Sequence, residues 1–163
     1  MKKLKLLSIY LFLFLLVWSF SSCSKTKSFI GTYDGVTNTS GTAYFSIPGY
    51  GETNEDIPAD QQNVTFEISK GEDNNKIVLK QTSGDVNQQF EAIGVVNDKT
   101  ATFLPFTIPL SYANINVDAQ VTDMVATVED GTLTYSYSYS YYQSLMGATI
   151  SIRINANGTA EKK

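Results

Sequence analysis

The sequence predicts an all-β fold, a single antiparallel β-barrel of about eight or nine strands. Short segments of alternating apolar and polar residues recur from residue 29 to residue 155, and clusters of Gly, Asn and Asp separate them. No segment shows the longer period of an amphipathic helix. A β-sandwich is the alternative arrangement, but a barrel is favoured because closing the sheet removes exposed strand edges.

The clearest alternation runs from Leu133 to Tyr142. A period of two puts one apolar set on a single face of the strand, namely Leu133, Tyr135, Tyr137, Tyr139 and Tyr141. The hydroxyl residues between them fall on the other face. Asp130-Gly131 precedes this run and is typical of a type I′ hairpin, which places Val128 and Ala126 beside Leu133 and Tyr135. The apolar residues of the two paired strands fall on the same face, so we expect the tyrosines to point into the barrel.

The remaining expected strands are residues 29–36, 41–47, 63–70, 76–82, 88–96, 100–105, 114–121, 122–129 and 146–155. Residues 37–40 are predicted to form a turn, and residues 157–163 a polar tail. Residues 48–62 are predicted to be the longest loop, because they hold two Pro, two Gly and four acids without periodicity. Pro105 and Pro109 exclude a central strand in the segment around them.

The composition excludes several chemistries. The chain has no His and a single Cys, which rules out His general bases, Ser-His-Asp and Cys-His sites, His- or Cys-ligated zinc and an internal disulfide. A net charge of −4 argues against nucleic acid as a partner. The acids of residues 48–62 do not have the spacing of an EF-hand, so a solvated acidic segment is preferred over a calcium site. Nothing places two carboxylates on one inward face, so we expect no enzyme, cofactor or metal.

The amino terminus predicts export. Three lysines among the first five residues precede an apolar run over residues 6–17, and Phe20-Ser21-Ser22-Cys23 follows. This pattern resembles a bacterial lipobox, which implies cleavage before Cys23 and lipidation of its sulfur. The expected organisation is a signal peptide over 1–22, a lipidated Cys with its tether over 23–28, and a barrel domain over 29–163. The alternative is a retained signal anchor. Ser24, where an inner-membrane lipoprotein often has Asp, favours the outer membrane, facing either the periplasm or the exterior.

A family resemblance rests on short β-turn motifs. The chain carries Gly31-Thr32-Tyr33-Asp34-Gly35 soon after the lipobox, a strand-turn-strand over residues 64–80, and Gly131-Thr132-Leu133-Thr134-Tyr135 near the end. This layout resembles a group of small lipoproteins of Gram-negative bacteria with a calycin-like (lipocalin-like) β-barrel. Lipocalins have Trp where this chain has Tyr33, covered by an Arg of the last strand. The resemblance therefore suggests that Arg153 covers the Tyr33 ring in a cation–π contact; the alternative is a solvated Arg.

The expected function is that of a lipid-anchored, non-catalytic envelope protein that binds a small amphipathic or hydrophobic ligand. Tyrosine suits such ligands because it joins an apolar ring to one hydroxyl. The candidate cavity residues are Tyr135, Tyr137, Tyr139 and Tyr141, with Phe45, Phe66 and Phe103 opposite. In the alternative, these rings fill the core, and the protein binds a partner protein or a glycan through its rim loops. The volume behind the tyrosines distinguishes the two.

Overall fold

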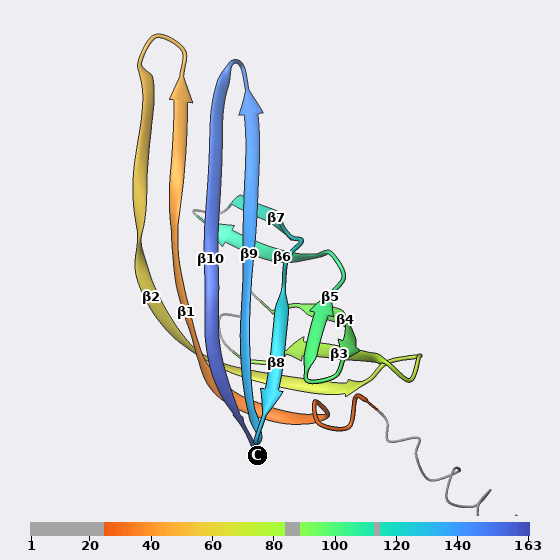
Figure 1. Ribbon diagram of the computed structural model, residues 1–163. Helices are drawn as coiled ribbons and strands as arrows, with labels where there is room; N and C mark the ends of the chain where they lie inside the picture. The colour runs from red at the N-terminus through yellow and green to blue at the C-terminus, as the bar shows by residue number, and fades with distance from the viewer. Residues whose placement is uncertain (1–24, 84–88, 113–114) are drawn as a thin grey trace, which may run out of the picture.

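The protein is described by a computed structural model over residues 25–83, 89–112 and 115–163 (Figure 1). These residues form ten strands and no helix. The strands are β1 (Gly31–Ile47), β2 (Gly51–Lys70), β3 (Lys76–Gln81), β4 (Glu91–Asn97), β5 (Thr100–Phe103), β6 (Phe106–Tyr112), β7 (Ile115–Val121), β8 (Val125–Glu129), β9 (Thr132–Leu145) and β10 (Ala148–Lys162). The predicted all-β class is confirmed.

Eight of the strands close into a barrel. They are antiparallel and follow the order β10-β1-β2-β3-β4-β5-β8-β9, and β9 pairs with β10 to complete the ring. β7 joins the free part of β9 beyond β8, and β6 ends the sheet. The architecture is therefore the barrel rather than the sandwich. β6 is an edge strand, which explains how it accommodates Pro109.

The hairpin β8–β9 has the register that the sequence predicts. Ala126 pairs with Tyr135 and Val128 with Leu133, so only Asp130 and Gly131 form the loop. Both have positive φ angles, 50° and 86°, as a type I′ turn requires.

Four strands are much longer than the rest and reach beyond the barrel, as Figure 1 shows. They pair in the order β2-β1-β10-β9 over almost their whole length. We call their protruding part, residues 42–56 and 140–153, the extension. In the extension β2 pairs with β1 alone, because its pairing with β3 starts only at Phe66.

The lengths of β1, β2 and β10 correct three predictions. Residues 37–40 are not a turn but the middle of β1, where Thr37 points inward and Asn38 outward, each paired with both β2 and β10. Residues 51–62 are not a loop but the start of β2. Pro58 is tolerated because this strand is an edge and the register shifts opposite Thr39 and Gly41. Residues 157–162 are not a tail, because β10 runs to Lys162 between β1 and β9.

Both ends of the barrel are closed. At one end a turn over residues 25–29 buries Thr26 and Phe29 completely, and the Tyr33 hydroxyl donates to the Phe29 carbonyl at 2.9 Å. At the other end the β6–β7 hairpin contributes Ile108, Ala119 and Val121 to the core. Phe106 of this hairpin stacks on Phe90, with 4.8 Å between ring centroids. The turn and the hairpin therefore cover the core at its two ends.

Candidate functional site

The tyrosines of β9 form a column inside the barrel. Tyr135, Tyr137 and Tyr139 expose 2%, 8% and 8% of their surface, while Ser136 and Ser140 on the opposite face are exposed. The rings of Tyr135 and Tyr137 stack at 6.5 Å, and those of Tyr137 and Tyr139 at 6.2 Å. The prediction that the tyrosine face is the interior is confirmed.

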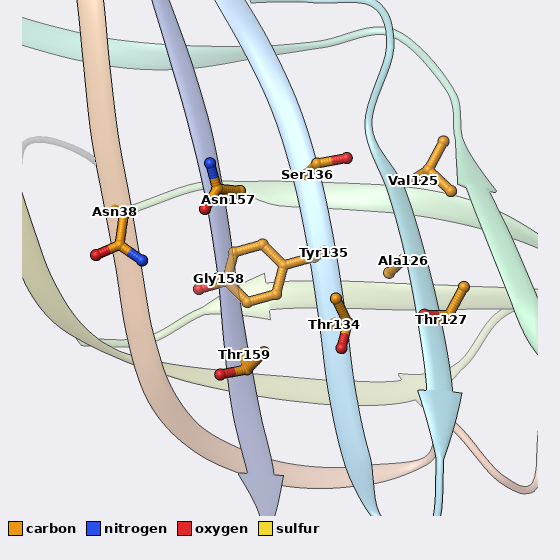
Figure 2. A pocket seen from close by; sticks show the side chains of 10 residues that line it. All are labelled: Asn38, Val125, Ala126, Thr127, Thr134, Tyr135, Ser136, Asn157, Gly158 and Thr159. Carbon is orange, nitrogen blue, oxygen red and sulfur yellow. The ribbon is translucent and has the colours of Figure 1, made fainter.

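Tyr135 links β9 to β1 across the intervening strand. Its hydroxyl lies 2.6 Å from the Thr37 hydroxyl and donates to the Val36 carbonyl at 3.1 Å. The ring crosses β10 at Gly158, as Figure 2 shows. A Cβ atom on Gly158 would lie 2.5 Å from the Tyr135 hydroxyl oxygen and would also meet the Val36 carbonyl. Glycine is required here because the phenol occupies the space that a side chain would need.

Burial changes the acidity of this column. It raises the pKa of Tyr135 to about 12, against a smaller opposing effect of the Thr37 hydrogen bond. It also raises the pKa values of Tyr137 and Tyr139. The desolvated phenols therefore stay neutral over the physiological pH range, and the column acts as an uncharged, largely apolar core.

The column encloses very little space. The pocket beside Tyr137 and Tyr139 has a volume of about 10 Å³, and Thr37, Gln62 and Ile108 also line it. That is about the size of one water molecule, whereas sites for small organic ligands usually measure roughly 300–1,000 Å³. The geometry favours the alternative in which the rings fill the core.

The predicted cavity residues are only partly brought together. Phe66 packs edge-on against Tyr135 at 4.9 Å, and Phe103 is buried beside Gly94. Phe45 and Tyr141 instead lie half-buried in the extension, on the same face as the core residues but beyond the barrel. The sequence pattern fixes a face but not how far along the strand that face remains enclosed.

The cation over Tyr33 is Lys162, not Arg153. The Lys162 ammonium lies 5.7 Å from the centre of the Tyr33 ring. Arg153 lies nine residues earlier on β10, about 30 Å away along the strand. It is exposed on the outer face between Thr42 and Ser140. The expected contact is therefore wrong, because β10 continues past the predicted strand end and brings Lys162 to the barrel end that residues 25–29 cover.

Open space lies on the outside of the barrel instead. A trough of about 370 Å³ runs over four adjacent strands, β1, β10, β9 and β8 (Figure 2). Ten residues line it and none is charged: Asn38, Val125, Ala126, Thr127, Thr134, Tyr135, Ser136, Asn157, Gly158 and Thr159. We call this site the outer trough. The sequence pattern marked Thr134 and Ser136 as outward, but it assigned Asn38 to a turn and Asn157 to a tail. Only the pairing of four strands gathers these residues.

The acids of β2 do not gather in the same way. Glu52, Asp56 and Asp60 are spread along an extended, exposed strand. Within the described ranges no cluster of three or more His, Cys, Asp or Glu could hold a metal ion. The same ranges contain no helix long and apolar enough to cross a bilayer.

The chain resembles few known proteins. No protein-family model matches it, and no curated protein matches it. Among solved structures it is similar to Ail, the attachment invasion locus protein of Yersinia pestis, with a TM-score of 0.39 and 9% identity over 80% of this chain and 99% of that chain. It is also similar to the ywiB protein of Bacillus subtilis, with a TM-score of 0.27 and 9% identity over 77% and 92% of the two chains. Neither likeness carries an argument about function.

Proposed function

We propose that this protein is a lipid-anchored, non-catalytic interaction module of the cell envelope, which binds its partner on the outer trough rather than inside the barrel. The contrast between the two spaces carries the proposal: about 10 Å³ beside the tyrosines and about 370 Å³ on the outer face. A packed barrel is a rigid support for a surface site, because interdigitated cores deform little.

The barrel end that is covered by residues 25–29 supports attachment through Cys23, which itself lies outside the described residues. Thr26 and Phe29 are buried at this end, so a lipid three residues before Thr26 would hold it next to the membrane. β1 has 17 residues and is about 55 Å long if fully extended. The extension would then stand far from the lipid surface. Charged, exposed side chains on the outer wall, such as Glu67, Lys80 and Glu91, suit a wall in water.

Metabolic labelling tests the anchor. Cells that express the full chain are fed an alkyne fatty acid, and the protein is captured and detected by click chemistry. We expect label on the wild-type protein and none on Cys23→Ala, with Ser24→Ala as the matched control that keeps the label. Equal labelling of the wild type and Cys23→Ala would contradict lipidation at this residue.

Site-specific photo-crosslinking tests the interaction. A benzophenone amino acid replaces Asn157 in the outer trough, and in a second strain it replaces Ser69, an exposed outward residue at the far end of β2. We expect ultraviolet light to join an envelope macromolecule to position 157 but not to position 69. Equal crosslinking at both positions, or none at position 157, would contradict the outer trough as the working surface.

A further inference from the structure

We infer that the outer trough binds a neutral glycan; this inference rests on the proposed function and names the chemistry of its partner. The lining combines apolar surface with a set of hydrogen-bonding groups. Most of its side chains end in a hydroxyl or an amide, namely Asn38, Thr127, Thr134, Ser136, Asn157 and Thr159. Each of these groups both donates and accepts hydrogen bonds, as the hydroxyls of a sugar do.

These polar groups are available to a ligand. Asn38 accepts one hydrogen bond from Gln61 at 2.9 Å, which orients its amide. Within the described residues, Thr134, Ser136 and Asn157 make no side-chain hydrogen bond that would have to break. All three are exposed and stand on adjacent strands, with Asn157 paired to Ser136. A sugar ring laid across this pair would meet one amide and one hydroxyl at about the 4.8 Å spacing of neighbouring strands.

None of the ten lining residues is charged, which favours a neutral partner. The whole chain has a formal charge of −4, yet its acids lie outside the trough. An acidic polymer would meet repulsion without a compensating cation, whereas a neutral sugar needs none. The lining also lacks the Trp, Met and Arg that mark the centres of protein interfaces. A neutral glycan therefore fits this surface better than a protein or an acidic polymer.

Two aromatic rings, Tyr142 exposed and Tyr44 half-buried, extend the same face. Tyr44 and Tyr142 both pair with Ser151, one from each side, so they flank β10 at about twice the strand spacing, roughly 10 Å apart. Tyr142 is 68% exposed, although it is large and apolar. Both lie on the outer face six residues beyond the trough, about 20 Å along the strands. Tyrosine rings can stack against the C–H face of a sugar, so they would bind a later unit of a chain that starts in the trough.

Affinity electrophoresis of the full, lipidated protein tests this inference, in a detergent without a sugar headgroup. Native gels contain dextran, mannan or galactan as neutral probes, or polygalacturonate as the acidic comparison. We expect at least one neutral polymer to retard the wild-type protein and polygalacturonate to have no effect. Asn157→Asp and Tyr142→Ala should each weaken the retardation about threefold to tenfold, the effect of one lost hydrogen bond or stacked ring. Ser69→Ala, outside the trough, should behave as the wild type.

Three results would overturn the glycan inference: no retardation by any neutral polymer, retardation by polygalacturonate alone, or equal retardation of Asn157→Asp and Ser69→Ala. Circular dichroism confirms that each variant is folded. The chemical nature of the partner crosslinked at position 157 distinguishes failure of the glycan inference from failure of the proposed function. A partner destroyed by protease and resistant to periodate would leave an interaction module that binds protein, whereas a periodate-sensitive, protease-resistant partner supports the glycan.

Discussion

The hydrogen bond between Tyr135 and Thr37 joins β9 to β1 and therefore tests how the barrel closes. Its two oxygens are 2.6 Å apart, and the side chains are 2% and 4% exposed. Tyr135 has one proton, which it donates to the Val36 carbonyl at 3.1 Å. It follows that Thr37 is the donor to the Tyr135 oxygen. Removing the Tyr135 hydroxyl should therefore cost a different amount of stability from removing the Thr37 hydroxyl.

Tyr135→Phe leaves the buried Thr37 hydroxyl without an acceptor, and we expect it to lower the free energy of unfolding by about 1–3 kcal/mol. Thr37→Val removes the donor but leaves Tyr135 bonded to the Val36 carbonyl, so a loss of about 0.5–1.5 kcal/mol is expected. The double variant replaces both partners by apolar groups. Its loss should be smaller than the sum of the two single losses, with a coupling of about 1 kcal/mol.

Equilibrium urea unfolding, followed by the near-ultraviolet circular dichroism of the tyrosines, measures these differences. Unchanged slopes with denaturant would confirm that only stability has changed. Single losses that add within about 0.3 kcal/mol would show that the two hydroxyls do not interact. That result would refute the closure of the barrel by a β9 tyrosine that reaches β1.

Three further predictions concern the same column. Gly158→Ala should lower the unfolding midpoint in urea, because the new methyl group meets the Tyr135 phenol; an unchanged midpoint would contradict that contact. Tyr137→Ala should cost about 3–5 kcal/mol in the same assay, whereas Tyr142→Ala on the exposed face should cost less than about 0.5 kcal/mol; similar losses would contradict the assigned faces. The contribution of the three tyrosines to stability should be constant from neutral pH to about pH 10 and should fall from there to about pH 12. The unfolded chain releases its phenolic protons first, while burial holds the pKa of Tyr135 at about 12 and raises those of Tyr137 and Tyr139. Thermal unfolding at a series of pH values measures this, and a stability that rises over that interval would contradict it.

The barrel and its inner face could be predicted because local signals specify them. Asp130-Gly131 fixes a two-residue loop, and that loop fixes the register of the strands on either side. The alternation of tyrosine and serine then leaves one choice of interior. These signals act within one hairpin, so they need no knowledge of the remaining chain.

The start of β2 could not be predicted because it lacks an enclosed face. Residues 51–62 of β2 are almost entirely exposed, so no apolar period marks them as a strand, and their Pro and Gly residues are typical of a loop. They are extended because β1 pairs with them. The continuity of β1 through residues 37–40 has the same cause, since strands on both sides hold a segment of turn-like composition.

The filling of the core depends on contacts between distant segments. Whether tyrosines line a cavity or pack solidly is decided by the turn that buries Phe29 at one end and by Ile108 of the β6–β7 hairpin at the other. Neither segment has a local sequence pattern that predicts that it covers an end of the barrel. The outer trough is also non-local, because Asn38 and Ser136 are 98 residues apart in the sequence and are brought together only by β10.

Native mass spectrometry of the protein purified from the envelope of its own host tests most directly whether the barrel is solid. Gentle ionisation preserves a molecule enclosed by the tyrosines, while mild collisional activation removes one held only on the outer face. We predict the mass of the lipidated chain with no small molecule retained after activation. A stoichiometric amphipathic molecule that survives activation would show that the barrel holds its ligand inside.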